Sequence, residues 1–260
     1  MKAGLETLYR TCNDPVYIHP DPLERVVIFP SVKDREIAGM IASCLAFGRV
    51  SQILVALSRI FSIMGPSPRK YVEEGDERRF KRDFKGFVYR FVREEHMVAL
   101  LSGLREMVDS FGTLEGCFVS GMSQDDETVL EAMTPFVGHL VKRYDPGYLL
   151  ARPDRKSSMK RMNLFLRWMV RKDRVDPGGW TGVEPARLIV PLDTHMHRIS
   201  VRLGLTERKA SDMRTALEIT GAFRRYSPED PVKYDFALTR FGIRSELDMD
   251  RCCDFLQGTG

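Results

Sequence analysis

Apolar residues recur at helical spacing along most of this 260-residue chain, and this periodicity limits the fold more than any other feature. The longest such stretch runs from Asp34 to Ile63, with an interruption at Phe47-Gly48-Arg49. Strand signals are sparse, and Leu188-Ile189-Val190 before a proline is more typical of a buried approach to a helix. The sequence therefore predicts an all-α fold. Further helices are expected at residues 96–111, 126–144, 158–171 and 193–203.

The chain is long enough to form two helical lobes that share a core. The best candidates for lobe-joining segments are Asp145–Lys156 and Asp173–Pro185. We expect an inner lobe at residues 34–175, a second lobe formed by residues 1–33 and 185–260, and a cleft between them. Lys160 would then lie on the inner lobe, and Asp193 would open a helix of the other.

Composition narrows the class of protein. Hydrophobic residues make up 43% and charged residues 29%, a balance typical of soluble globular proteins, and the net charge of +4 says little about a polyanionic partner. The N-terminus lacks the apolar core of a signal peptide, and no stretch is apolar enough to span a bilayer. We therefore expect a cytoplasmic protein with reduced thiols. The five cysteines, which form no spaced framework, are at positions 12, 44, 117, 252 and 253.

The segment 158–171 is a basic amphipathic helix that Ser157 or Ser158 can cap. Its apolar residues share one broad face, and Lys160, Arg167 and Arg171 share the opposite stripe. Two interpretations stay open. The stripe is either an ordinary solvated face or a phosphate-facing surface, with Lys160 held near the helix N-terminus at a cleft.

The segment from Pro191 to Leu205 is the most informative in the sequence. Asp193 has the chemistry of an N-cap residue, and Gly204 is the expected residue just after the helix. Asp193 is either a capping residue alone or a functional carboxylate. More polar residues flank it on the same helix: His195, Arg198 and Arg202.

A metal site at Asp193, His195 and His197 is a further hypothesis. The two histidines are two positions apart, so on a helix they point to different sides, whereas ligand pairs are three or four apart. We therefore expect no metal and no cofactor.

The residues "VPLDTHMHRISVRLGL" at Val190–Leu205 resemble the segment that carries the catalytic aspartate of endonuclease III-like enzymes, in the helix-hairpin-helix DNA glycosylase superfamily. Ser227–Gly242 is similar to the family's next helix, and Ile41–Ile53 resembles its helix-kink-helix element. The chain is also similar to an uncharacterised bacterial family of about this length, marked by "KRxNLFLRWMVR" and "PLDTH". Together these resemblances span about Asp34 to Phe241.

The sequence departs from the superfamily pattern in two places. The hairpin of the form L-P-G-V-G-x-K is absent, and Asp176–Gly182 occupies its place with a longer turn. The four-cysteine iron–sulfur spacing is also missing, because Cys252 and Cys253 are adjacent. The first departure puts sequence-independent DNA anchoring in doubt, and the second removes the cluster.

The resemblance implies a DNA glycosylase with AP lyase activity. Lys160 precedes Asp193 by a spacing similar to that of the nucleophilic lysine in archaeal 8-oxoguanine glycosylase, which places it ahead of Lys172 and Lys156. Lys160 would form the Schiff base, and Asp193 would stabilise the sugar cation. The partner would be double-stranded DNA with a damaged base, bound by a monomer. The DNA-binding candidates are Arg167, Arg171, Arg198, Arg202 and His195, and the base-stacking candidates are Phe47, Trp168 and Trp180.

Two alternatives remain beside the glycosylase. One is a catalytically inactive DNA-binding relative. The other is a metal-dependent hydrolase that uses Asp193, His195 and His197. Trapping with borohydride separates the first alternative from the glycosylase, and the metal content of the purified protein tests the second.

Overall fold

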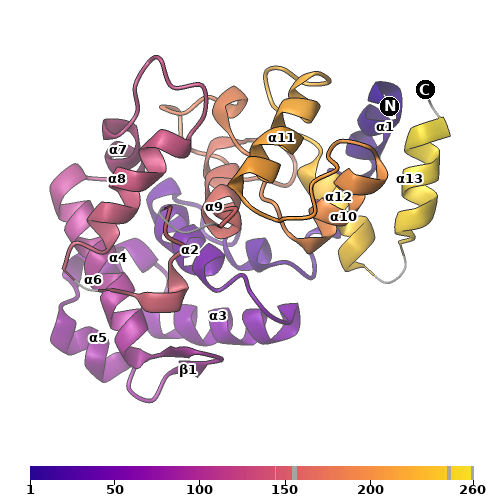
Figure 1. The fold of residues 1–260 in the computed structure, drawn as a ribbon. Helices are drawn as coiled ribbons and strands as arrows, with labels where there is room; N and C mark the ends of the chain where they lie inside the picture. Colours follow the sequence, from indigo (N-terminus) through magenta and orange to yellow (C-terminus); the bar gives the residue numbers. More distant parts are fainter. Residues whose placement is uncertain (144, 154–156, 245–246, 259–260) are drawn as a thin grey trace. The chain divides into compact units, whose positions relative to one another are not determined.

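The structure is a computed structural model and describes residues 1–143, 145–153, 157–244 and 247–258. The fold is all-α, as predicted, because the only strands in these ranges form one two-stranded antiparallel ladder of two residues each (Figure 1). The chain divides into two compact units. We call Pro20–Arg155 with Gly179–Gly182 the central unit, and Met1–His19 with Lys156–Gly178 and Val183–Gly260 the terminal unit.

The central unit is built around α6, a helix whose residues from Met97 to Leu104 are all buried. Helices α4, α5, α7 and α8 pack against α6 (Figure 1). Gly103 permits the close approach of α8, because a Cβ atom there would collide with the Leu140 carbonyl. The elements are η2 (Pro22–Arg25), α2 (Val32–Cys44), α3 (Val50–Met64), α4 (Pro68–Glu74), α5 (Glu77–Asp83), β1 (Val88–Tyr89), β2 (Val92–Arg93), α6 (Glu94–Phe111), α7 (Leu114–Ser120), α8 (Leu130–Leu140) and η3 (Gly147–Leu149).

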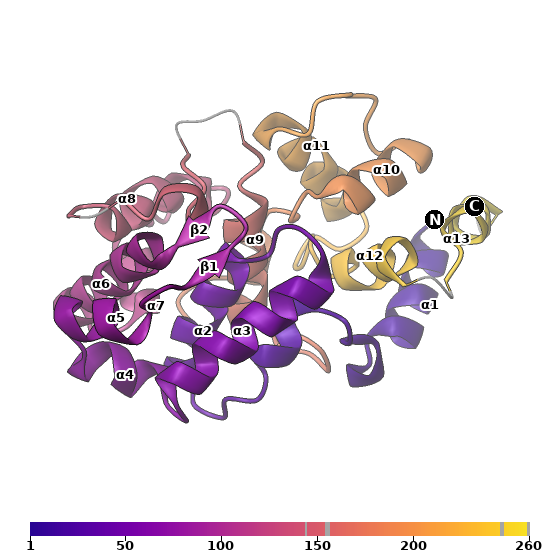
Figure 2. The same cartoon turned by 90° about the horizontal axis from the view of Figure 1, so that it is seen from below.

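The terminal unit joins the two ends of the chain. Helix α1 packs against α12 and α13, so the N- and C-terminal helices lie side by side (Figures 1 and 2). Glu6 on α1 accepts hydrogen bonds from Lys233 Nζ at 2.8 Å and Tyr234 Oη at 2.6 Å. The elements are α1 (Lys2–Cys12), η1 (Pro15–Tyr17), α9 (Lys160–Val170), η4 (Pro185–Arg187), α10 (Thr194–Arg202), α11 (Met213–Arg224), α12 (Asp235–Ile243) and α13 (Met249–Gly258).

Several predicted helix boundaries are confirmed. The expected interruption at residues 47–49 falls between α2 and α3, and α6 ends at Phe111, directly before Gly112, which has a φ of +75°. The helix expected at 126–144 is shorter, because α8 covers Leu130–Leu140, and Tyr144 lies outside the described residues. Residues 188–190 form no strand.

The division of the chain differs from the two lobes expected from the sequence. Residues 156–178, which carry α9, belong with Asp193 in the terminal unit rather than with residues 34–155. Residues 20–33 belong to the central unit instead of the second lobe. The physical reason for the first difference is that ion pairs tie α9 to α12 and to the segment before it. Arg167 pairs with Asp235 in the interior, and Arg171 pairs with the partly exposed Asp230.

Among the described residues, no single helix has the length and apolar character needed to cross a membrane. The bent pair α3 and α4 meets the length and composition criteria only when its two helices are joined, across a bend of 56°. Most apolar side chains of α3 are buried in the central unit, which is typical of a core helix.

Candidate functional site

Lys160 and Asp193 come together in the terminal unit. Lys160 is the first residue of α9, and its Nζ lies 3.7 Å from Asp193 Oδ2. The side chains are 34% and 18% exposed, so the pair is accessible to a ligand without being fully solvated. The pair expected from the sequence is therefore adjacent in space.

The two carboxylate oxygens of Asp193 have different neighbours. Oδ1 accepts a hydrogen bond from the Met196 amide at 2.8 Å, which caps α10 as predicted. Oδ2 faces Lys160. The cap holds the carboxylate in a fixed orientation, and one oxygen is left to act on a neighbouring positive charge.

The N-terminus of α9 is held by residues that sequence reasoning assigned differently or missed. Ser158 does not cap the helix. Its buried hydroxyl donates to the Leu192 carbonyl at 3.1 Å, and Asn163 Nδ2 donates to the Ser158 carbonyl at 3.1 Å. Met159 takes the N-cap position in a left-handed conformation, with a φ of +51°. Ser158, two residues before Lys160, is thereby tied to Leu192, the residue before Asp193.

Asn163 is almost completely buried, and its Oδ1 has no hydrogen-bond partner among the described residues. A polar side chain in a helix interior that carries an unsatisfied buried oxygen is uncommon, because burying such a group without a partner costs free energy. The only sequence signal for this residue was its polar character, three positions after Lys160 in the amphipathic helix expected at residues 158–171. We regard Asn163 as a positioning residue of the pair.

A buried carboxyl lies close enough to Asp193 to interact with it electrostatically. Burial raises the pKa of Asp235 to about 6. The positive charge of Arg167 opposes this shift, and the negative charges of Asp193 and Asp176 add to it. Asp235 is paired with Arg167, and its Oδ1 has no hydrogen-bond partner in the described part of the chain.

Arg167 and Arg171, expected from the sequence to face DNA phosphates, are instead buried and paired with carboxylates. Both side chains are only 3% exposed. Arg167 binds Asp176 Oδ1 through Nε and Nη2 at 3.2 and 3.0 Å and also pairs with Asp235. Carboxylates on the loop and helices around α9 thus neutralise the stripe that the helical wheel placed on the surface. Arg171 pairs with Asp173, Asp176 and Asp230.

Trp168 and Trp180, two of the base-stacking candidates, are buried, so their rings are not presented at the surface. Trp168 is completely buried in the terminal unit. Trp180 is buried in the central unit, where its Nε1 donates to Glu36 Oε1 at 2.8 Å. Phe47 alone of the three is partly accessible.

The polar residues of α10 have separate environments. Arg198 is exposed, whereas the guanidinium of Arg202 pairs with Asp250. The ring of His195 packs against Gly242, where a Cβ atom would collide with it. His197 Nε2 is 2.8 Å from the Arg208 carbonyl. Within the described ranges, no three His, Cys, Asp or Glu side chains are grouped so that they could hold a metal ion, so the geometry gives the hydrolase hypothesis no ligand set.

Comparison with protein families gives one match. A family model described as a protein of unknown function, DUF2400, matches residues 21–244. The chain belongs to the DUF2400 family. Comparison with curated proteins and with solved structures gave no match. The match begins in the central unit and extends to the end of α12, so the DUF2400 family region includes Lys160, Asn163 and Asp193.

Proposed function

We propose that this DUF2400 chain is a DNA N-glycosylase with AP lyase activity, with Lys160 as nucleophile and Asp193 as the stabiliser of the sugar cation. The observation that carries the proposal is the 3.7 Å separation of Lys160 Nζ and Asp193 Oδ2 at the starts of two successive helices. The resemblance of Val190–Leu205 to endonuclease III-like glycosylases supports the same pair. The substrate would be a damaged nucleotide turned out of a DNA duplex.

The first step breaks the bond between base and sugar. The electron pair of the N-glycosidic bond leaves with the base, which takes up a proton, and positive charge develops on the sugar. The Asp193 carboxylate stabilises this charge through the oxygen that the helix cap leaves available. Because capping already fixes the carboxylate, little reorganisation is needed when the charge appears.

The second step joins the enzyme to the sugar. Lys160, after it loses its proton, adds its nitrogen lone pair to the anomeric carbon, and opening of the sugar ring gives a protonated Schiff base. Loss of a proton from the neighbouring carbon then expels the 3′ phosphate with the electrons of its C–O bond. The strand is cut, and hydrolysis of the Schiff base returns free Lys160.

The phosphate contacts that we propose near this pair use other groups than Arg167 and Arg171, which are buried. No side chain caps α9 in the part of the chain that the structure describes, so the first amide groups of α9 are suited to an anionic phosphate oxygen. Exposed Arg198 on α10 would add a second contact. Arg202 would contribute less, because Asp250 already balances its charge.

The test is borohydride trapping on a panel of duplexes, each with one lesion or one abasic site. We expect a covalent adduct between the full-length protein and at least one duplex. Lys160→Gln should abolish the adduct. Lys172→Gln, an exposed lysine in the same unit, is the matched control and should keep it.

Two outcomes would contradict the proposal. An adduct that persists in Lys160→Gln would move the nucleophile to another lysine, such as Lys172 or Lys156, the latter outside the described residues. Salt-dependent duplex binding with no adduct on any duplex would favour the catalytically inactive DNA-binding relative.

A further inference from the structure

The central unit carries a cluster of exposed aromatic rings next to its β-hairpin. Phe91 and Tyr148 are 64% and 56% exposed, although large aromatic side chains are ordinarily buried. The ring centroid of Tyr148 lies 5.0 Å from that of Phe47 and 5.8 Å from that of Phe91. We call Phe47, Phe91 and Tyr148 the aromatic platform.

Arg90 lies beside two rings of this platform and has an unfavourable backbone conformation. It occupies the two-residue turn between β1 and β2 with a φ of +53°, a conformation for which glycine, asparagine or aspartate is preferred. Its guanidinium lies 5.9 Å from the Phe47 ring centroid and 5.7 Å from that of Phe91. Residues held in such a conformation cluster at binding and active sites, which supports a functional role for this turn.

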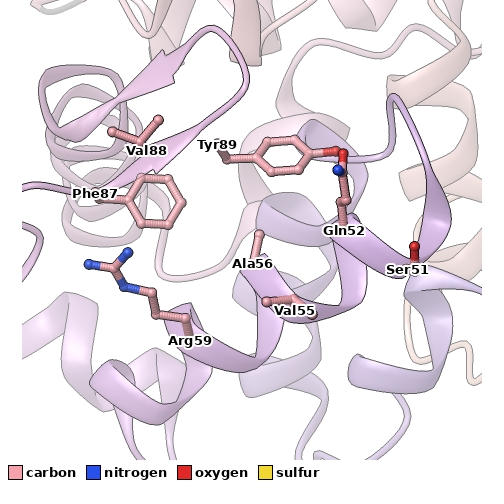
Figure 3. Close-up of a pocket in the computed structure, with 8 residues that line it drawn as sticks. All are labelled: Ser51, Gln52, Val55, Ala56, Arg59, Phe87, Val88 and Tyr89. Atoms are coloured by element: carbon pink, nitrogen blue, oxygen red, sulfur yellow. The ribbon is translucent and has the colours of Figure 1, made fainter.

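A pocket adjoins the platform between the hairpin and α3. Its volume is about 300 Å³, at the lower end of the range for small-ligand pockets. Phe87 and Tyr89 lie over α3, with Gln52 near the Tyr89 hydroxyl and Arg59 near the Phe87 ring (Figure 3). The Tyr89 hydroxyl donates to the Phe47 carbonyl, which links the pocket wall to the platform.

The two sequence stretches that form α3 and the hairpin carry charge of one sign. The sequence holds no aspartate or glutamate from Ile37 to Lys70 or from Phe84 to Arg93. The acidic residues that flank the second stretch are engaged: Asp83 accepts from Tyr71 Oη at 3.0 Å, and Glu94 accepts from the Gly86 amide at 2.6 Å. The exposed cations of these two stretches that form no ion pair among the described residues are Arg49, Arg59, Lys85, Arg90 and Arg93.

We propose that the aromatic platform and the adjoining pocket bind an unpaired nucleic-acid strand, with bases stacked on Phe91 and Tyr148 and phosphates paired with the arginines around them. Stacking surfaces inside a cationic groove are how proteins hold single strands without reading their sequence. An acidic peptide would pair with the arginines but would have no use for exposed rings. This inference does not rest on Lys160 and Asp193.

The experiment measures binding of a fluorescent twelve-nucleotide oligothymidine to the full-length protein by anisotropy at several salt concentrations. Phe91→Ala and Tyr148→Ala should each weaken binding roughly tenfold. Arg93→Ala should reduce the slope of affinity against salt, on logarithmic axes, by about 0.7. The matched controls are Phe255→Ala and Arg251→Ala, which remove an exposed ring and an exposed cation of the terminal unit and should change neither quantity.

Crosslinking locates the strand directly. An oligonucleotide that carries 5-iodouracil should crosslink to peptides that contain Phe91 or Tyr148, and the Lys160→Gln variant should crosslink equally well. Unchanged affinity in the Phe91→Ala, Tyr148→Ala double variant would overturn the proposal. So would displacement of the strand by polyglutamate at the concentration at which unlabelled oligothymidine displaces it, because that would show a site for acidic chains in general.

Discussion

In the terminal unit, Arg167 and Arg171 are buried among carboxylates, whereas in the central unit Arg90 and Arg93 lie exposed on a hairpin without an ion-pair partner in the described ranges. The first pair was the more obvious DNA-binding candidate in the sequence, because both arginines lie on one stripe of an amphipathic helix. The comparison shows that clustering along a helix face does not identify an anion site. What matters is whether the chain supplies carboxylates to the same place, and Asp176, Asp230 and Asp235 do so for α9.

The largest effect is expected from breaking the ion pairs that Arg167 makes with Asp176 and Asp235. Arg167→Ala leaves the Asp235 carboxylate buried without its cation, while Asp176 keeps only Arg171, and loss of one partner of a buried pair costs about 3–5 kcal/mol. Urea unfolding should show this loss. Arg202→Ala breaks only an exposed pair with Asp250 and should cost less than about 1 kcal/mol. Equal losses in the two variants would mean that the network contributes no more than a surface pair.

The next effect concerns the carboxylate that both faces Lys160 and caps α10. Asp193→Asn should keep the cap, because asparagine caps as well as aspartate, while the negative charge is lost. On the duplex that gives an adduct, we expect the rate of base release or strand cleavage to fall roughly a hundredfold or more. The unfolding midpoint should not change. If the variant unfolds instead, Asp193 is a structural cap, and the terminal unit has no assigned catalytic carboxylate.

The sequence predicted those parts of this site that depend on local rules. The cap at Asp193, the glycine after α10 and the break before α3 are local, and each is confirmed. The burial of Arg167 depends on Asp235, 68 positions away, which no helical wheel can reveal. The hairpin was missed because its strands have two residues each, and its turn holds Arg90-Phe91 where glycine or asparagine would have indicated a turn.

Asn163 tests whether the turn before α9 sets the geometry of the pair. Asn163→Ala removes the hydrogen bond to the Ser158 carbonyl, and small misplacements of catalytic groups reduce rate strongly. We expect kcat for strand cleavage to fall on the order of tenfold with little change in KM. Ser200→Ala, which changes a buried serine of α10 whose hydroxyl donates to the Met196 sulfur, is the control and should leave kcat unchanged. A change in KM alone would place Asn163 in substrate binding instead.

A smaller effect is expected in the pH dependence of stability, through the buried carboxyl of Asp235. Because the folded-state pKa of Asp235 is raised to about 6, above its ordinary value of 3.8, the folded protein holds a proton that the unfolded chain has lost between these values. Asp235 therefore contributes stability below about pH 4 that is lost as the pH rises through about 6. Asp235→Asn should remove this decline, so the midpoint of the wild type should fall relative to the variant by a few degrees between pH 4 and 7. Parallel profiles would show that Asp235 titrates normally.

The smallest effect distinguishes strain from binding at the hairpin. A left-handed conformation costs a residue other than glycine about 1–2 kcal/mol, and glycine gives back part of that gain through its greater freedom in the unfolded chain. Arg90→Gly should therefore stabilise the protein by less than about 1 kcal/mol, a rise of roughly 1–3 °C in the thermal midpoint. The same change removes the guanidinium that lies near Phe47 and Phe91, so affinity for an unpaired strand should fall. Higher stability with weaker binding would show that Arg90 is kept at this turn for its side chain. Lower stability with unchanged binding would show that Arg90 stabilises the fold, as the buried arginines of α9 do, and does not bind the strand.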